Sequence, residues 1–382
     1  MSARLRPLLV LACIALLWWL AADGRTGSDS GGEASTEGRA SETATPPGDG
    51  ATPAGEAPAP EPTLDQRARS ILPEASCVRP DRSTASGPAP RCVASLGRAI
   101  TLGIAPGGPL AIVSLTHSAT MSWSLPRAIL DRPFDPLPAD AEAQAIFVAE
   151  PGTRALFAVG SRILRYDTTS GRVADAIDGP GGRIGDLAAT SDGSAIAVVA
   201  SGDGQAHLLD ATGTPVRTLA TADRAARIAI DTTGSRAAVA TEVGSIALFD
   251  LAGGAEPVVA TPSLEPAAAL AFGRDALYAA GSDGVLRALD PRSGTVAWQR
   301  DVGSPLVALA LARGGRVAAT GARDRVLRLH ALPGGEILDA LEWHRAGIAG
   351  LAFGAGPTLV SADRDGELAV WDLGGDGRRA AR

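Results

Sequence analysis

The amino-acid sequence predicts an all-β fold, a seven-bladed β-propeller, from three observations. A pattern of three short strand-like runs followed by an outer strand recurs at intervals of 41, 41, 40, 40, 43 and 43 residues. Its seven copies share a third run that passes through Trp371, His330, Leu289, Phe249, Leu209, Tyr166 and Trp123. The runs have period two and mix small and large apolar residues, and nothing between residues 98 and 373 has the pattern of a long amphipathic helix. Repeats of about forty residues are typical of propeller blades.

The last copy, residues 341–373, is the clearest. It contains His344, Ser361, Asp365 and Trp371, with the Asp six residues before the Trp and followed by Gly in a tight turn. This pattern resembles the WD40 repeat family, although only the last repeat has the complete set. The resemblance implies that the four side chains form a buried hydrogen-bonded chain, which needs every member to find a partner. We therefore interpret them as scaffold and not as a catalytic triad.

One repeat resembles a different family of propellers. The segment Ala288 to Gly303, ALDPRSGTVAWQRDVG, is similar to the repeats of quinoprotein-like propellers, which include the lipoprotein of the outer-membrane assembly machinery. Those propellers typically have eight blades, whereas this sequence has seven copies. The resemblance keeps open an alternative function, an enzymatic or cofactor-binding propeller of quinoprotein or lactonase type.

The chain begins with a predicted targeting segment, residues 1–22. Arg4 and Arg6 precede fifteen unbroken apolar residues, which is short for a membrane span and long for a signal peptide core. An uncleaved anchor, a cleaved signal peptide and a lipoprotein modified at Cys13 all remain open. Each of them predicts that the rest of the chain is exported: it faces the periplasm or the cell exterior, or it is secreted if the segment is cleaved.

Residues 23–63 are predicted to be a disordered linker. This stretch is rich in Gly, Ser, Thr, Ala and Pro and holds eight acidic residues and two Arg, a net charge of -6. A segment of this composition cannot bury enough apolar surface to order itself. We expect it to hold the propeller clear of a membrane, followed by a lead-in segment at residues 64–90, the propeller at residues 91–373 and a tail at residues 374–382.

The end of the propeller predicts how the ring closes. Outer strands are expected at 172–177, 215–219, 257–261, 295–300 and 336–341. After Trp371 too few residues remain for the seventh blade to form its own outer strand. The segment Arg91 to Leu96 is the natural donor, because it would remove an exposed strand edge. The spacing of Cys77 and Cys92 in an exported chain favours a disulfide that ties the lead-in segment to this closing strand, over a redox or metal pair.

The sequence gives little indication of catalytic chemistry. The four His are His117, His207, His330 and His344, and neither their spacing nor their periodicity makes them converge on a metal. The stretch Asp363 to Gly366 looks like the start of a calcium loop but lacks the remaining acidic ligands, so we interpret it as a blade turn. No phosphate-binding Gly loop or nucleophile elbow is present. The prediction is no enzyme, no catalytic or metal-binding residues and no cofactor.

The candidate functional surface is therefore a rim of loops. If the family arrangement holds, the loops that lead into each inner strand and those that follow each second strand meet at one end of the channel. That rim would carry the candidate partner-binding residues Arg183, Arg224, Arg323, Arg325, Trp343, Arg345 and Arg364. Arg and Trp are enriched at binding hot spots, although all 35 basic residues of this chain are Arg, so a plain solvated surface is the competing interpretation. The net charge of -7 gives no case for nucleic acid. The sequence thus predicts a non-enzymatic scaffold that binds an unidentified protein partner and is held at the membrane by residues 1–22.

Overall fold

The computed structural model describes part of the chain. The described residues are Val78 and residues 88–96, 100–104, 110–115, 120–124, 129–138, 141–149, 152–253, 256–261, 263 and 265–374. All of them lie in one compact unit, residues 60–382. The predicted targeting segment and linker, Cys77, His117 and all but the first residue of the predicted tail lie outside them. Within the described ranges no helix is long and apolar enough to cross a membrane.

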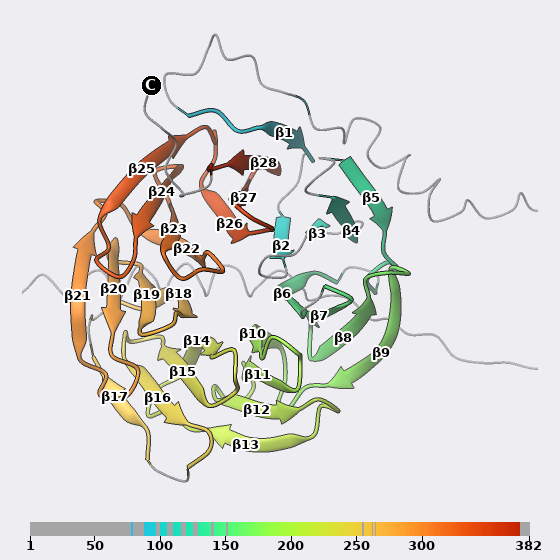
Figure 1. Ribbon diagram of the computed structural model, residues 1–382. Coiled ribbons are helices and arrows are strands. Elements are labelled where there is room, and N and C mark those ends of the chain that lie inside the picture. Colours follow the sequence, from blue (N-terminus) through green and yellow to red (C-terminus); the bar gives the residue numbers. More distant parts are fainter. Residues whose placement is uncertain are drawn as a thin grey trace, which may run out of the picture. The chain divides into compact units, whose positions relative to one another are not determined.

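The described chain is all-β and forms seven antiparallel sheets of four strands, which confirms the predicted seven-bladed propeller (Figure 1). The inner strands are β2 (Ile100–Ile104), β6 (Ala143–Ala149), β10 (Ile184–Ala189), β14 (Ala225–Ile230), β18 (Ala267–Phe272), β22 (Leu306–Leu311) and β26 (Ile348–Phe353). The second strands are β3 (Leu110–Leu115), β7 (Arg154–Val159), β11 (Ala195–Ala200), β15 (Arg236–Thr241), β19 (Leu277–Gly281), β23 (Val317–Ala322) and β27 (Thr358–Asp363).

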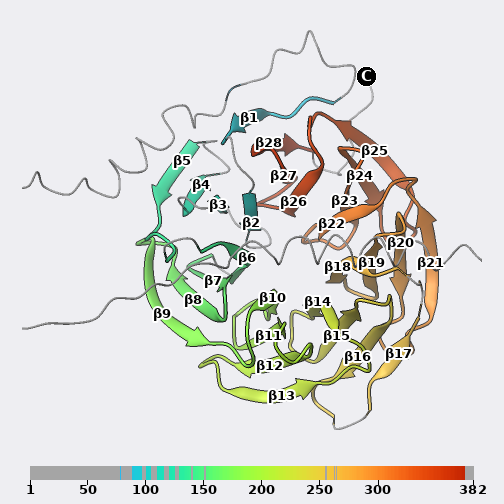
Figure 2. The same cartoon turned by 180° about the vertical axis from the view of Figure 1, so that it is seen from behind.

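The remaining strands complete the blades toward the outside. The third strands are β4 (Thr120–Ser124), β8 (Arg162–Asp167), β12 (Ala206–Asp210), β16 (Ile246–Asp250), β20 (Val285–Leu289), β24 (Val326–Ala331) and β28 (Glu367–Asp372). The outer strands of the first six blades are β5 (Ile129–Pro133), β9 (Arg172–Asp178), β13 (Pro215–Leu219), β17 (Val258–Ala260), β21 (Val296–Asp301) and β25 (Ile337–Glu342). The outer strands thus lie within about two residues of the predicted positions. Seen from behind, the same outer strands follow the circumference (Figure 2).

The seventh blade takes its outer strand from the other end of the sequence, as predicted. Strand β1 (Cys92–Ser95) pairs antiparallel with β28, with Cys92 opposite Val370 and Ser95 opposite Glu367. On its other edge Val93 exchanges two hydrogen bonds of 2.9 Å with Val78. Cys92 is disulfide-bonded. Its partner is not among the described residues, so the pairing with Cys77 stays a prediction.

The propeller has no single core. Seven clusters of buried apolar side chains lie between neighbouring blades, one for each junction around the ring. The cluster between the last blade and the first contains Cys92 and Ala94 of β1 together with Met121 of β4 and Val370 of β28. Each blade is therefore stabilised by both of its neighbours, and the seventh junction exists only if the ring closes.

Small residues let the inner strands approach one another. A Cβ atom on Gly321 would come within 2.6 Å of a methyl group of Ile348 in the next blade, and one on Gly103 within 2.3 Å of a methyl group of Ile146. Such contacts would force the neighbouring strand to move. The alternation of small and large residues in the sequence thus follows from the narrowing of the space toward the axis.

We predict that a chain starting at residue 97 is much less stable than one starting at residue 60. The shorter chain lacks β1, so β28 has an unpaired edge and the cluster between the last and first blades loses three of its members, Cys92, Ala94 and Leu96. Thermal unfolding should show a lower melting temperature for the shorter chain, and size-exclusion chromatography should show self-association. Equal melting temperatures and monomeric behaviour of both chains would contradict this account of ring closure.

Candidate functional site

Backbone hydrogen bonds tie the loops at one end of the channel into a rim. In five consecutive blades the first residue after the second strand donates its N–H to the carbonyl of the residue just before the inner strand. The donors are Ser201, Glu242, Ser282, Arg323 and Arg364, and the acceptors are Arg183, Arg224, Pro266, Pro305 and Gly347, at 2.8 to 3.0 Å. The two kinds of loop therefore do meet, as predicted.

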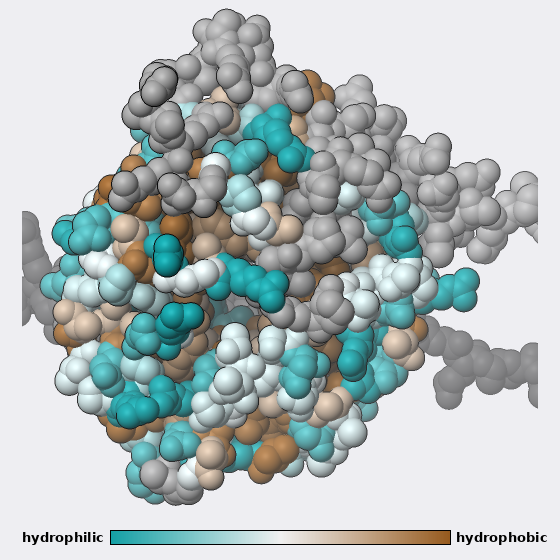
Figure 3. Space-filling model, in the orientation of Figure 1, coloured by the Kyte–Doolittle hydropathy of each residue, from teal (hydrophilic) through white to brown (hydrophobic). Residues whose placement is uncertain are grey.

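A cavity of about 470 Å³ opens inside this rim, over blades four to seven. Its charged lining consists of Arg227, Glu242, Arg323 and Arg364, and Ser282 adds a hydroxyl group. The rest of the lining comes from Ala, Pro, Leu, Val and Ile side chains. The space-filling view likewise shows hydrophilic side chains around the middle of one face, with hydrophobic ones between them (Figure 3). The cavity thus combines apolar walls with a few charges.

The structure brings only some of the predicted rim residues together at this cavity. All six predicted Arg are exposed, but only Arg323 and Arg364 line it. Arg224 instead donates to the carbonyl of Ser201 at 2.8 Å and lies 3.9 Å from Glu242. Arg325 donates to the carbonyl of Arg345 at 3.5 Å. Arg183 and Arg345 lie on the rim outside the cavity lining.

Trp343 lies partly within the packing between blades. Its side chain is half-buried and packs against the apolar cluster between blades six and seven. Burial of part of so large an apolar surface is favourable. Part of the side chain is left exposed, so its role as a binding residue stays a prediction.

Two charged residues that the sequence did not single out lie on inner strands. Asp186 of β10 accepts the backbone N–H of Ile228 at 3.0 Å, and Arg227 of β14 donates to the carbonyl of Ala268 at 2.8 Å. Each bond crosses from one blade to the next. Burial raises the pKa of Asp186, while its hydrogen bond from Ile228 and the charge of Arg227 oppose this. The signal that could have found them is their spacing of 41 residues within inner runs that are otherwise apolar.

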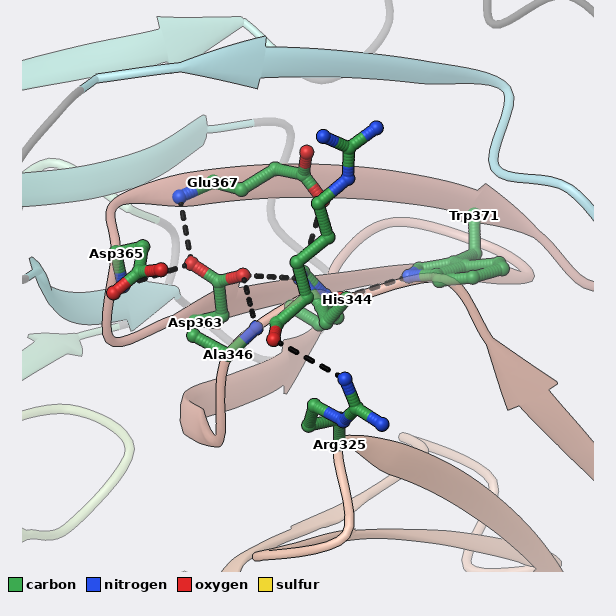
Figure 4. A network of polar contacts seen from close by, with 9 residues as sticks. Arg325, His344, Ala346, Asp363, Asp365, Glu367 and Trp371 are labelled. Carbon is green, nitrogen blue, oxygen red and sulfur yellow. Dashed lines mark hydrogen bonds and ion pairs between the residues drawn. The ribbon is translucent and has the colours of Figure 1, made fainter.

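The polar chain of blade seven is buried, and it contains a different Asp from the predicted one (Figure 4). Trp371 Nε1 donates to Ser361 Oγ at 2.8 Å, and that hydroxyl lies 2.7 Å from His344 Nε2. His344 Nδ1 faces Asp363 Oδ2 at 3.3 Å. Asp363 also accepts the backbone N–H groups of Ala346, Asp365 and Glu367.

Asp365 is exposed and takes no part in the chain, so its predicted role was wrong. The reason is the alternation of β27, which points Ser361 and Asp363 to the same buried side, whereas Asp365 lies two residues later in the turn. In other blades the Asp of this turn pairs with a basic residue four positions on, as Asp283 does with Arg287 and Asp324 with Arg328. Asp365 has Ala369 at that spacing and finds no such partner.

The direction of the hydrogen bonds indicates which ring nitrogen of His344 carries the proton. An indole N–H can only donate, so Ser361 Oγ accepts from Trp371 and has its own hydrogen left for His344 Nε2. A neutral imidazole that accepts at Nε2 has its proton on Nδ1. That N–H then points at two carboxylates, Asp363 at 3.3 Å and Glu367 at 3.6 Å.

The same three side chains form the one group in the described residues that could hold a metal ion, with ligand atoms within 4.8 Å of one another. A metal would need the lone pair of His344 Nδ1, and the opposite tautomer would leave the hydroxyl hydrogen of Ser361 without an acceptor. Burial alone would raise the pKa of Asp363, but hydrogen bonds from His344 and the Glu367 N–H hold it below its usual value. Burial raises the pKa of Glu367. The three side chains therefore suit an Nδ1–H of His344 that faces two carboxyl groups better than they suit a metal ion.

Blade six repeats this arrangement with other residues. Thr320 and His330 lie 41 residues before Ser361 and Trp371, and Thr320 Oγ1 is 2.9 Å from His330 Nε2. His330 Nδ1 lies 3.3 Å from the carbonyl of Gly335, which can only accept, so Nδ1 carries a proton and donates. Burial, with the nearby charges of Arg328 and Arg300, lowers the pKa of His330 although the bond to Gly335 opposes this.

Comparison with known proteins supports the propeller fold and its repeats, and it does not assign the whole chain to one family. Residues 159–331, less than half of the chain, match the family model described as outer membrane protein assembly factor BamB. A chain in the structure titled "Crystal Structure of Mitotic Checkpoint Complex" has the same fold, with a TM-score of 0.66 and 14% identity over 77% of this chain and 95% of that one.

A curated relative matches a shorter stretch. Cilia- and flagella-associated protein 44 of Chlamydomonas reinhardtii is 38% identical over 105 residues, which are 25% of this chain and 6% of that protein. The chain thus covers a small part of the length of this relative, and the match adds evidence for the repeats only.

The two Asp of the last blade should differ in their effect on stability. We expect Asp363→Asn to reduce the free energy of unfolding by about 1–3 kcal/mol. An amide has only one acceptor oxygen, so some of the buried donors that now bind the carboxylate would lose their partner. Asp365→Asn, the matched control, should stay within about 0.5 kcal/mol of the natural chain, since the side chain is exposed. Urea denaturation measures both, and an equal or larger loss for the Asp365 variant would contradict the assignment.

Acidification should reveal the neutral His330. Below about pH 6.5 the unfolded chain binds a proton at this residue that the folded chain resists, so the free energy of unfolding falls as the pH decreases toward the lowered folded pKa. In His330→Leu, which has the residue found at the equivalent positions Leu209 and Leu289, this part of the pH dependence should vanish. Denaturation curves between pH 8 and pH 5 measure it, and parallel pH profiles for the two chains would overturn the prediction.

Proposed function

We propose that this chain is a non-enzymatic scaffold that presents the rim of its propeller to a partner protein on the extracytoplasmic side of a membrane. The observation that carries the proposal is the rim itself, where five loop junctions are held by backbone hydrogen bonds and the exposed Arg323 and Arg364 line a cavity. A closed ring that offers exposed, charged side chains suits protein binding more than catalysis.

The proposed location rests on the sequence and on one comparison. Residues 1–22 have the composition of an anchor or signal peptide, and the acidic stretch 23–63 would serve as a tether. The family model that matches residues 159–331 is described as an outer membrane protein assembly factor. By this likeness the partner is a protein of the cell envelope, bound during its assembly.

The alternative is a quinoprotein-like or lactonase-like propeller with an enzymatic or cofactor-binding role. The 470 Å³ cavity and the charged Arg227 near the channel favour this alternative, because small-molecule sites combine apolar walls with a few polar groups. A cofactor or metal that co-purifies with the protein in stoichiometric amount would support it over the scaffold.

The proposal is tested by crosslinking in intact cells, followed by mass spectrometry of the purified full-length protein. We expect a single envelope protein to crosslink to the rim loops, and its recovery to fall severalfold in the triple variant Arg323→Gln, Arg325→Gln and Arg364→Gln, because side chains at the centre of an interface dominate its energy. The same sample reports whether residues 1–22 are retained.

The control removes the same charge from the opposite end of the ring. Arg172, Arg274 and Arg292 are exposed and lie in or beside the turns on that side, so their triple replacement by Gln should leave recovery of the partner unchanged. Equal loss in both variants, or crosslinks only to the opposite turns, would contradict a partner-binding rim.

A further inference from the structure

Two Arg side chains at the cavity have no bonding partner among the described residues. Arg323 and Arg364 occupy equivalent positions in neighbouring blades, 41 residues apart, and both line the cavity. Their backbone N–H groups are bonded to the rim, but among the described residues neither guanidinium has an ion-pair or hydrogen-bond partner. Two other exposed Arg of the rim, Arg224 and Arg325, do donate hydrogen bonds from their side chains.

A third guanidinium is held in place at the same cavity. Arg227 donates from Nε to the carbonyl of Ala268 and from Nη1 to the carbonyl of Ala226, both at 2.8 Å. These bonds fix the plane of the group across the junction of blades four and five. They leave Nη2 without a hydrogen-bond partner among the described residues. The group is therefore already oriented, and Nη2 is available to donate to a ligand.

We propose that this cavity binds an acidic segment of a partner polypeptide, with carboxylate side chains paired to Arg323 and Arg364 and a further acceptor at Arg227. The inference rests on the proposed scaffold function and adds the chemistry of the partner. Planar guanidinium groups bind carboxylates through two parallel hydrogen bonds, which are stronger than bonds between neutral groups.

The rest of the lining favours a polypeptide over a nucleic acid. Between the Arg side chains the wall consists of apolar side chains such as Pro266, Pro305 and Val307, which suit the aliphatic parts of a peptide. Glu242 lies in the same lining and would repel a run of phosphates, whereas a peptide can place a neutral residue there. Of the chain's net charge of -7, residues 23–63 carry -6, so the rest of the chain is close to neutral and lacks the net positive charge that favours nucleic acid.

The test uses the full-length protein and a fluorescein-labelled peptide of alternating Glu and Ala, with the Gln–Ala peptide as its uncharged match. Fluorescence anisotropy should show binding of the acidic peptide alone. The variant Arg323→Gln with Arg364→Gln should bind it about tenfold more weakly or worse, because each lost bond to a charged group has a large effect. Glu242→Gln should bind it more tightly, since a like charge has been removed.

The matched control is Arg172→Gln with Arg274→Gln. It removes two exposed charges from the opposite end of the ring, and neither side chain lines the cavity, so its affinity for the acidic peptide should equal that of the natural chain. Thermal melting of both double variants should match the natural chain, which separates loss of binding from loss of fold.

Three results would overturn the proposal: equal weakening in the two double variants, equal binding of the uncharged peptide, or displacement of the peptide by millimolar inorganic phosphate, which would indicate a site for small anions. The outcome is separable from that of the scaffold. If the crosslinked partner still needs the rim while the acidic peptide does not bind, the scaffold stands and the acidic chemistry is wrong.

Discussion

The pairing of β1 with β28 is the constraint on which the rest of the structure depends. Because the apolar core is divided into seven clusters between blades, the ring gains its seventh cluster only when the start of the propeller adds an outer strand to its last blade. The hydrogen bonds of Val93 to Val78 continue the attachment beyond the strand. Ring closure thereby fixes the circumference, and with it the distances between all the loops at the channel mouth.

Closure also explains why charges from separate repeats can act together. Inner strands that converge on one axis bring equivalent residues of neighbouring blades close to each other, although they are about forty residues apart in the chain. Arg323 and Arg364 meet at the cavity for this reason, and Asp186 and Arg227 bridge the blade junctions for the same reason. In a propeller, equivalent positions of successive repeats therefore lie close together in space. The charges that gather there depend on which residue each repeat has at that position.

The buried polar chains of the last two blades have the same geometry although their residues differ. A hydroxyl on the second strand and a ring nitrogen on the third meet in both of the last two blades, as Ser361 with Trp371 and as Thr320 with His330. The blades use different partners to complete the chain, two carboxylates near His344 in one and a backbone carbonyl in the other. The polar chains therefore stabilise individual blades.

The sequence by itself determined the fold class, the number of blades, the positions of five outer strands and the origin of the closing strand. It could do so because period-two runs and forty-residue spacing follow directly from strand geometry and from the repetition of one unit. Only the tertiary structure decided which Asp joins His344, since a shift of two residues at the end of β27 separates a buried position from an exposed turn. It also decided that Trp343 is half-buried against the cluster between blades six and seven and that Arg227 lies at the cavity, because what a residue contacts depends on the neighbouring blade and not on its own repeat.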